Sequence, residues 1–305
     1  MARENDLRTE LAGLATEAGG RRRDLDLLPT DELVRAMNDE DARVPAAVRV
    51  AAPEIARAVD GISERMSRGG RLVYLGAGTS GRLGVLDASE CPPTFGIDPS
   101  RVVGVIAGGD GALRLSAESA EDDPEQGAAD VAALGLGPDD ALVGVAASGR
   151  TPYVVGALTH AAGVGAFTVA VACNAGSRIG AVADIAIEVV TGPEFIAGST
   201  RLKAGTAQKL VLNMLSTLTM VRLGATYGDI MIDMRATNAK LHARAQRMVA
   251  DVTGCTLDEA AAALAEARGS AKTATLMVLA GVSAPEAERR LGAAGGRLRA
   301  ALAGE

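Results

Sequence analysis

Five short runs of successive apolar residues, separated by stretches long enough for a helix, set the strongest limit on the fold of this chain. The runs are Leu72–Leu75, Val102–Ala107, Ala141–Ala147, Phe167–Ala172 and Ile185–Val190. Their residues are apolar in succession instead of alternately, as expected of strands covered on both faces in a parallel sheet. The pattern predicts an α/β fold, with an open doubly wound sheet of about five parallel strands and flanking helices. Ligands of such sheets bind beyond the carboxyl ends of the strands, so function should be sought in the loops after these runs.

Apolar residues recur at helical spacing on either side of the sheet region. We expect helices at Asp31–Asn38 and Val44–Met66, a long apolar helix between Gly205 and Gly224, and a further helix at Thr237–Val249. The long helix is apolar enough for the core or for a subunit interface. Residues 253–303 resemble a small bundle of three or four short helices, with capping boxes at Thr256–Glu259 and Ser283–Glu286.

The predicted elements divide the chain into three parts: an N-terminal segment with helices at residues 1–60, the sheet domain at 61–225, and a helical C-terminal region at 226–305. Residues 1 to about 28 are polar, rich in Arg and Gly, and without clear periodicity. We expect that first segment to be partly ordered at best.

The net charge of −7 argues against a nucleic-acid partner, because phosphate-backbone binding needs a concentrated basic face. No apolar run reaches the roughly 18 residues of a membrane helix, and the N-terminus lacks a signal-peptide core, so we expect a soluble, cytoplasmic protein. Three widely spaced cysteines, Cys91, Cys173 and Cys255, suit reduced thiols. The chain has two histidines and no paired cysteines, so we expect no metal or other cofactor and chemistry that depends on carboxylates.

The loop after the first apolar run, Gly76 to Gly81, is a glycine-rich bend that contains Gly78, Thr79 and Ser80 and leads into a helix. Such a bend aims backbone N–H groups and the positive end of a helix dipole at one point, which suits an anion. We expect the Pro92-Pro93 pair to end this helix, with Glu90 just before it.

Two further post-strand loops combine glycine, hydroxyls and a basic residue. After the third run come Ser148, Gly149, Arg150 and Thr151, followed by Pro152 in the first turn of a helix; after the last run come Ser199, Thr200 and Lys203. Three such loops beyond one sheet edge favour a phosphate site. The alternative is ordinary turn and helix-cap chemistry in all three.

Several of these patterns have a second interpretation. Gly76 to Gly81 fits G-x-G-x-x-G, but a dinucleotide site wants an acidic residue about 20 positions later, and only Asp110 comes near. Glu90 could be an exposed helix-end residue. Spacing does not distinguish Glu121 from the rest of the acidic run between Glu118 and Glu125, and His242 could equally be a site residue or a surface residue.

Three stretches resemble the N-acetylmuramic acid 6-phosphate etherase family. They are Gly76–Gly84 with Leu86–Thr94, which includes Ser89-Glu90-Cys91-Pro92-Pro93, then Ala147–Tyr153, and Arg201–Thr217. The resemblance runs from about Leu28 to the C-terminus, without a departure at a motif position. It implies a sugar isomerase (SIS) fold for the sheet domain, a C-terminal module similar to ubiquitin-associated domains, and a homodimer.

The resemblance also implies hydrolysis of the lactyl ether of N-acetylmuramic acid 6-phosphate during peptidoglycan recycling. The family's acid falls on Glu90 and its second catalytic glutamate on Glu121, while assistance from His242 in ring opening is a weaker expectation. Opening the sugar makes the C2 proton acidic, a base removes it, and lactate leaves from C3 as an acid protonates its oxygen. Glu90 must then start protonated, which favours a site that buries it or sets it beside another carboxylate.

Other classes of protein with this fold remain open at this stage. A non-catalytic sugar-phosphate sensor would act on transcription, which needs a basic recognition helix, or on a sugar kinase, where the carboxylates would be lost. An aldose–ketose isomerase would release no lactate. A lactate assay separates these alternatives.

Overall fold

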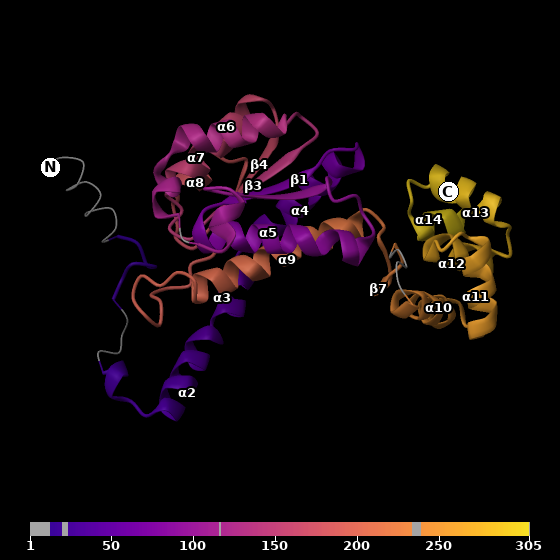
Figure 1. The fold of residues 1–305 in the computed structure, drawn as a ribbon, viewed down its shortest axis with the longest axis horizontal. Coiled ribbons are helices and arrows are strands. Elements are labelled where there is room, and N and C mark those ends of the chain that lie inside the picture. The colour runs from indigo at the N-terminus through magenta and orange to yellow at the C-terminus, as the bar shows by residue number, and fades with distance from the viewer. Residues whose placement is uncertain (1–12, 20–23, 116, 234–238, 305) are drawn as a thin grey trace. The chain divides into compact units, whose positions relative to one another are not determined.

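A five-stranded parallel sheet forms the centre of the first structural unit (Figure 1). The computed structural model describes residues 13–19, 24–115, 117–233 and 239–304. The strands are arranged in the order β2-β1-β3-β4-β5. Their bounds are β1 Leu72–Gly76, β2 Val102–Ile106, β3 Ala141–Ala146, β4 Phe167–Ala172 and β5 Ile185–Glu188. All five predicted runs are therefore strands, and the predicted parallel sheet is confirmed.

Helices cover both faces of the sheet. The helices α6 (Pro124–Leu134), α7 (Pro152–Gly163) and α8 (Arg178–Ala181) pack on one face, in a core that includes Leu75, Leu142 and Leu158. The opposite face carries α4 (Ala52–Ser67), α5 (Gly78–Phe95) and α9 (Lys203–Arg222). Tyr74 of β1 points to this second face, where its hydroxyl donates to the carbonyl of Leu212 in α9. Burial on both faces explains why the strand sequences do not alternate.

The N-terminal elements are η1 (Leu25–Leu27), α2 (Thr30–Asp41) and α3 (Val44–Val50). The prediction of one helix over Val44–Met66 is wrong, because the helix breaks at Ala51 between α3 and α4. Pro53 lies in the first turn of α4, where its missing N–H costs nothing, whereas inside a continuous helix it would have lost a bond. In the described part of the first segment, residues 13–19, Leu14 and Thr16 are buried.

The Pro92-Pro93 pair does not end α5, contrary to the prediction. The helix runs to Phe95 with both prolines inside it, and the N–H of Gly96 still donates to the carbonyl of Pro92. Two prolines in succession remove two neighbouring donors from the last turns, where the helix is about to end in any case. The strands β1 and β2 are therefore joined by an 18-residue helix.

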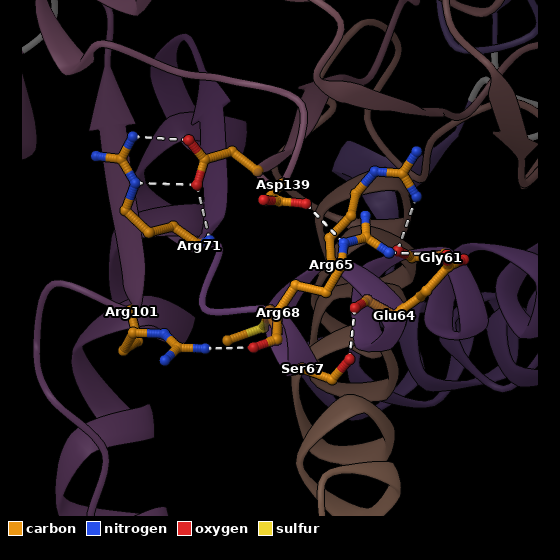
Figure 2. Close-up of polar contacts among 10 residues, drawn as sticks. Gly61, Glu64, Arg65, Ser67, Arg68, Arg71, Arg101 and Asp139 are labelled. Atoms are coloured by element: carbon orange, nitrogen blue, oxygen red, sulfur yellow. Dashed lines mark hydrogen bonds and ion pairs between the residues drawn. The ribbon is translucent and has the colours of Figure 1, made fainter.

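Arginines link the elements at the amino edge of the sheet (Figure 2). Arg68 donates to the carboxylate of Asp139, and Arg65 donates to the carbonyl of Gly61 while its guanidinium lies 4.4 Å from the ring centroid of Phe167. These contacts tie α4 to the segments that lead into β3 and β4. These intrachain contacts lie at the sheet edge opposite the predicted phosphate loops.

The second structural unit comprises residues 90–99 and 217–305. Its described residues include a short antiparallel pair, β6 (Thr226–Tyr227) with β7 (Ile230–Met231), and a group of helices with its own apolar core. The helices are α10 (Ala239–Thr253), α11 (Leu257–Glu266), α12 (Ala271–Ala280), α13 (Ala284–Ala293) and α14 (Leu298–Ala303). The predicted start of α10 at Thr237 lies outside the described residues.

The two predicted capping boxes have different outcomes. Thr256 and Glu259 form the predicted box at the start of α11. The box at Ser283 is wrong, because Ser283 makes no side-chain cap bond and Glu286 pairs with Arg289 and Arg290 instead. In the described residues, no helix combines the length and the apolar character that crossing a membrane requires.

Candidate functional site

The first predicted loop lies at the point where the sheet changes direction. The strands β1 and β3 are neighbours, with Gly76 in register with Val145, whereas the chain passes through β2 on the other side of β1. The loops after β1 and β3 therefore leave the same edge and diverge, which is where open α/β sheets bind ligands. A side chain at Gly81 would lie 2.6 Å from the carbonyl oxygen of Gly76, so the turn into α5 needs glycine there.

Thr79 and Ser80 of this loop have different surroundings. Thr79 is half-buried, whereas Ser80 is buried and its hydroxyl donates to Oε1 of Gln208 in α9 at 2.9 Å. Within the described residues, the buried Nε2 of Gln208 has no hydrogen-bond partner. Ser80 therefore joins α5 to α9, while Gly78 at the start of α5 is exposed.

The second loop is held in a tight turn. Gly149 has a φ of +73°, and a Cβ there would lie 2.4 Å from the Cβ of Ser177. The hydroxyl of Ser148 accepts from the N–H of Arg150 at 3.2 Å. Thr151 is the N-cap of α7 but makes no side-chain cap bond, and Pro152 begins the helix as predicted. The Thr151 hydroxyl is thus not used for capping.

The third loop approaches the first. The carbonyl of Thr200 accepts from the N–H of Gly205 at 2.9 Å. A Cβ at Gly205 would lie 3.5 Å from both that carbonyl oxygen and Cγ2 of Thr79. The half-buried residues Ser199 and Thr200 therefore lie on the same side of the sheet as the loop before α5.

Lys203, predicted to bind phosphate, is engaged with protein groups in this structure. Its ammonium pairs with the carboxylate of Glu40 in α2 at 2.8 Å, and its side chain is 2% exposed. The buried carboxylate of Glu194 accepts from the N–H groups of Lys203 and Ala204 and so caps α9. Sequence reasoning missed both glutamates, since neither carries a motif that distinguishes it.

The buried carboxylate of Glu194 also acts on its surroundings. Burial, and secondarily the charge of Glu194, raise the pKa of the Cys173 thiol to about 12. Cys173 is therefore a neutral, buried thiol, and none of the three cysteines forms a disulfide.

The predicted catalytic residues are all exposed, so the burial expected of Glu90 is not seen in this single chain. Glu121 lies in η3 (Glu118–Asp122), which with η2 (Asp110–Leu113) follows β2 at the same carboxyl edge of the sheet. Glu90 lies near the C-terminal end of α5, the opposite end of that helix from Gly78. His242 lies in the first turn of α10, in the second structural unit.

The structure thus brings the three predicted loops to one edge of the sheet, and it places Glu121 on a further loop of that edge. Backbone N–H groups, the start of α5, several hydroxyls and Arg150 are the groups that an anionic ester requires. The strand order also differs from the dinucleotide-binding order, which weakens that alternative for Gly76 to Gly81.

Comparisons with known proteins identify relatives of this chain. A family model described as the glucokinase regulatory protein N-terminal SIS domain matches residues 54–162, which include the first two loops. A relative from Streptomyces avermitilis named N-acetylmuramic acid 6-phosphate etherase is 58% identical over 304 residues, covering 99% of this chain and 98% of the relative. Proteins of the same name from Streptomyces coelicolor (58%, covering 98% of this chain and 96% of the relative) and Mycolicibacterium smegmatis (56%, covering 96% and 99%) are similar over nearly their full length.

Proposed function

Because this chain belongs to the N-acetylmuramic acid 6-phosphate etherase family, we propose that it cleaves the D-lactyl ether of N-acetylmuramic acid 6-phosphate with water. The products are N-acetylglucosamine 6-phosphate and D-lactate, and the reaction serves peptidoglycan recycling and amino-sugar catabolism. The observation that carries the proposal is the convergence of three hydroxyl-bearing loops on one sheet edge in a chain with these relatives.

The phosphate is held by the loops, which fixes the sugar for reaction. Its binding groups are Gly78, Thr79, Ser80, Ser148, Gly149, Arg150, Thr151, Ser199, Thr200 and Lys203. Gripping the phosphate uses binding energy remote from the reacting bond to orient the sugar. Lys203 is paired with Glu40 in this structure. Arg150 in the second loop is the other cation that we propose for the phosphate.

The chemistry uses positioned acid–base groups. Ring opening exposes an aldehyde at C1. A base removes the C2 proton, and the electron pair of the broken C2–H bond forms the C2–C3 double bond. The C3–oxygen bond breaks as an acid protonates the lactyl oxygen. Water then adds at C3 and a proton returns to C2, so that one water is consumed for each ether cleaved. Each positioned acid–base group contributes on the order of 10²–10⁴-fold.

Glu90 is the acid that protonates the lactyl oxygen and later activates water. Glu121 is the second carboxylate, acting as the C2 base or next to Glu90, and its place on the loop after β2 suits contact with the sugar. His242, which is exposed at the start of α10, is a weaker candidate for assisting ring opening.

We also propose that the protein acts as a homodimer, in the cytoplasm. Because α5 holds Glu90 and Gly78 at opposite ends, a sugar bound at the loops of one protomer would be served by Glu90 of another protomer. On α9, Met214, Leu218 and Val221 form an exposed apolar stripe at helical spacing, which a second copy could cover.

The function is tested by assaying D-lactate release from N-acetylmuramic acid 6-phosphate by the wild type and by Glu90→Gln. We expect the variant to lose at least about 10²-fold in kcat, while calorimetry shows unchanged binding of N-acetylglucosamine 6-phosphate. Glu125→Gln, which alters another exposed glutamate, should keep the wild-type rate. Normal lactate release by Glu90→Gln would refute the assignment of the acid.

The same assay separates the rival functions. A wild-type protein that binds N-acetylglucosamine 6-phosphate but releases no lactate would be a sensor. Interconversion of an aldose and a ketose phosphate without lactate would indicate an isomerase.

A further inference from the structure

A short N-terminal segment, Gly13 to Gly19, packs against the sheet edge that carries the predicted site. Thr16 in this segment is fully buried, and Leu14 is 6% exposed. The N–H groups of Glu17 and Ala18 both donate to the carbonyl of Leu14, which closes a turn. The segment is therefore an ordered part of the first structural unit.

Thr16 and Asn174 exchange hydrogen bonds. The side-chain amide of Asn174 donates to the hydroxyl of Thr16 at 2.9 Å, and its Oδ1 lies 3.4 Å from the N–H of Thr16. Asn174 follows β4 by two residues and is itself buried. This pair joins two positions that are 158 residues apart in the sequence.

The same Asn174 holds the second phosphate loop. Its Nδ2 lies 3.2 Å from the carbonyl of Ala147 and 3.4 Å from that of Ser148. Because an amide NH₂ has two hydrogens, one directed at Thr16 leaves the other for the two loop carbonyls. The hydroxyl and the N–H of Thr16 thus hold the side-chain amide of Asn174, and that amide bonds to the carbonyls of the loop.

The neighbouring residue reaches the third loop. A Cβ built on Gly198 would lie 3.3 Å from Oε2 of Glu17, and Gly198 directly precedes Ser199. One seven-residue segment therefore lies against both the Ser148 loop and the Ser199 loop. Both contacts are made by residues of the N-terminal segment, Thr16 and Glu17, and not by residues of the sheet strands.

We propose that Thr16 is a positioning residue for sugar-phosphate binding, which acts through Asn174 to hold the Ser148 loop in its binding conformation. This inference deepens the proposed function and rests on it. Loss of the Thr16 bond frees the loop before the ligand binds, so the cost of ordering it falls on binding and not on the chemical step. Loss of the Thr16 hydroxyl should therefore raise KM and leave kcat unchanged.

The test is Thr16→Val, which keeps the side-chain shape and removes the hydroxyl. We expect KM for lactate release to rise about fivefold to tenfold, as befits one net hydrogen bond, with kcat close to wild type. Tm should fall, because the buried amide of Asn174 loses a hydrogen-bond acceptor. Thr16→Ser should restore KM. Thr159→Val is the matched control, since the exposed Thr159 hydroxyl bonds only within its own helix, and it should change neither constant.

A double-mutant cycle tests the route through Asn174. If Thr16 acts through Asn174, adding Thr16→Val to Asn174→Ala should change KM by less than about twofold. An unchanged KM in Thr16→Val, an equal loss in Thr159→Val, or fully additive effects would overturn the proposal. Calorimetry on the same variants measures their affinity for N-acetylglucosamine 6-phosphate. We expect Thr16→Val to weaken this binding, and that result can be obtained even if the wild type releases no lactate. Failure of the proposed function is thereby distinguished from failure of this inference.

Discussion

The ion pair between Lys203 and Glu40 is unequal in burial. The Lys203 side chain is 2% exposed, whereas that of Glu40 is 28% exposed and also pairs with the more exposed Arg43. Removing one partner of such a pair has a cost that depends on whether water can reach the charge left behind. Loss of Glu40 would leave the Lys203 ammonium charged and buried, whereas loss of Lys203 would leave a carboxylate that water can partly reach.

We therefore expect Glu40→Gln to destabilise the protein more than Lys203→Met. Glu40→Gln leaves a buried ammonium without its counter-charge and should lower the free energy of unfolding by about 3 kcal/mol. Lys203→Met fills the same space and leaves a carboxylate that water can reach, so the loss should be about 1 kcal/mol. Urea unfolding measures both, with Arg43→Met as an exposed-pair control that should change little. The reverse order of the two losses would contradict this account.

Residue-scale prediction from the sequence succeeded where local backbone chemistry decides the position. Glycines and hydroxyls after apolar runs predicted the loop positions, and Pro152 at the start of α7 is confirmed. The partners of those residues were hidden, because Gln208 against Ser80 and Asn174 against Thr16 meet only in the folded chain. The role of Lys203 in phosphate binding stays a prediction.

At the scale of elements, one junction fixes the starts of β1 and β3. Arg71, just before β1, donates through Nε and Nη2 to the two oxygens of Asp140, just before β3, and its own N–H also donates to Asp140. The N–H of Gly137 adds a fourth bond. Burial would raise the pKa of Asp140, but the bonds from Arg71 and Gly137 outweigh it and hold the pKa below its usual value.

A lowered pKa in the folded state makes this junction sensitive to acid. The charged Asp140 stabilises the fold fully above the pKa of an Asp in the unfolded chain, roughly 4. This stabilisation is lost as the pH falls through the lower pKa that Asp140 has in the folded protein. Asp140→Asn should lower the free energy of unfolding by about 2 kcal/mol at pH 6. The difference in this free energy between the variant and the wild type, the stability gap, should become smaller as the pH falls towards 3. Thermal unfolding across this range measures the gap.

The adjacent residue supplies the control. Asp139 is 56% exposed and pairs with Arg68 at the surface, so Asp139→Asn should cost less than about 1 kcal/mol. A gap for Asp140→Asn that stays constant from pH 6 to pH 3 would show that its charge does not stabilise the junction.

The strands and helices were predicted best where an element is buried on both faces. All five strands followed from apolar runs, because a parallel sheet under helices leaves no polar face. The break at Ala51 and the passage of α5 through Pro92 and Pro93 were missed, since apolar periodicity does not reveal how a proline is accommodated. At Ser283 the capping pattern was present, but Glu286 had stronger arginine partners.

At the scale of the whole molecule, the chain has a separate apolar core in its second unit. Leu276, Ala274 and Val249 are among its fully buried residues. Lys272 is anchored there by Asp233 at 2.6 Å and by the carbonyl of Gly296 at 2.9 Å. Helical spacing and capping patterns predicted such a helical region, and the four helices α11 to α14 of the described residues agree with the expected three or four.

Helix α9 makes the homodimer testable. Its Val211, Leu212 and Leu215 are buried, whereas Leu218 and Val221 are each 43% exposed. Covering an exposed apolar stripe of this kind with a second copy of the chain would stabilise the dimer, because apolar surface is removed from water. We expect sedimentation velocity to show the wild type at twice its 30.8 kDa chain mass. Leu218→Glu should sediment as a monomer, because a carboxylate buried in the contact would lack a partner.

The monomeric variant should also lose lactate release while it still binds N-acetylglucosamine 6-phosphate, because we propose Glu90 of the partner subunit as the acid. Leu257→Glu is the matched control, because Leu257 is 56% exposed at the start of α11 and lies outside the stripe. A dimeric Leu218→Glu would exclude the stripe as the contact. A fully active monomer would show instead that each chain brings its own Glu90 to its own sugar.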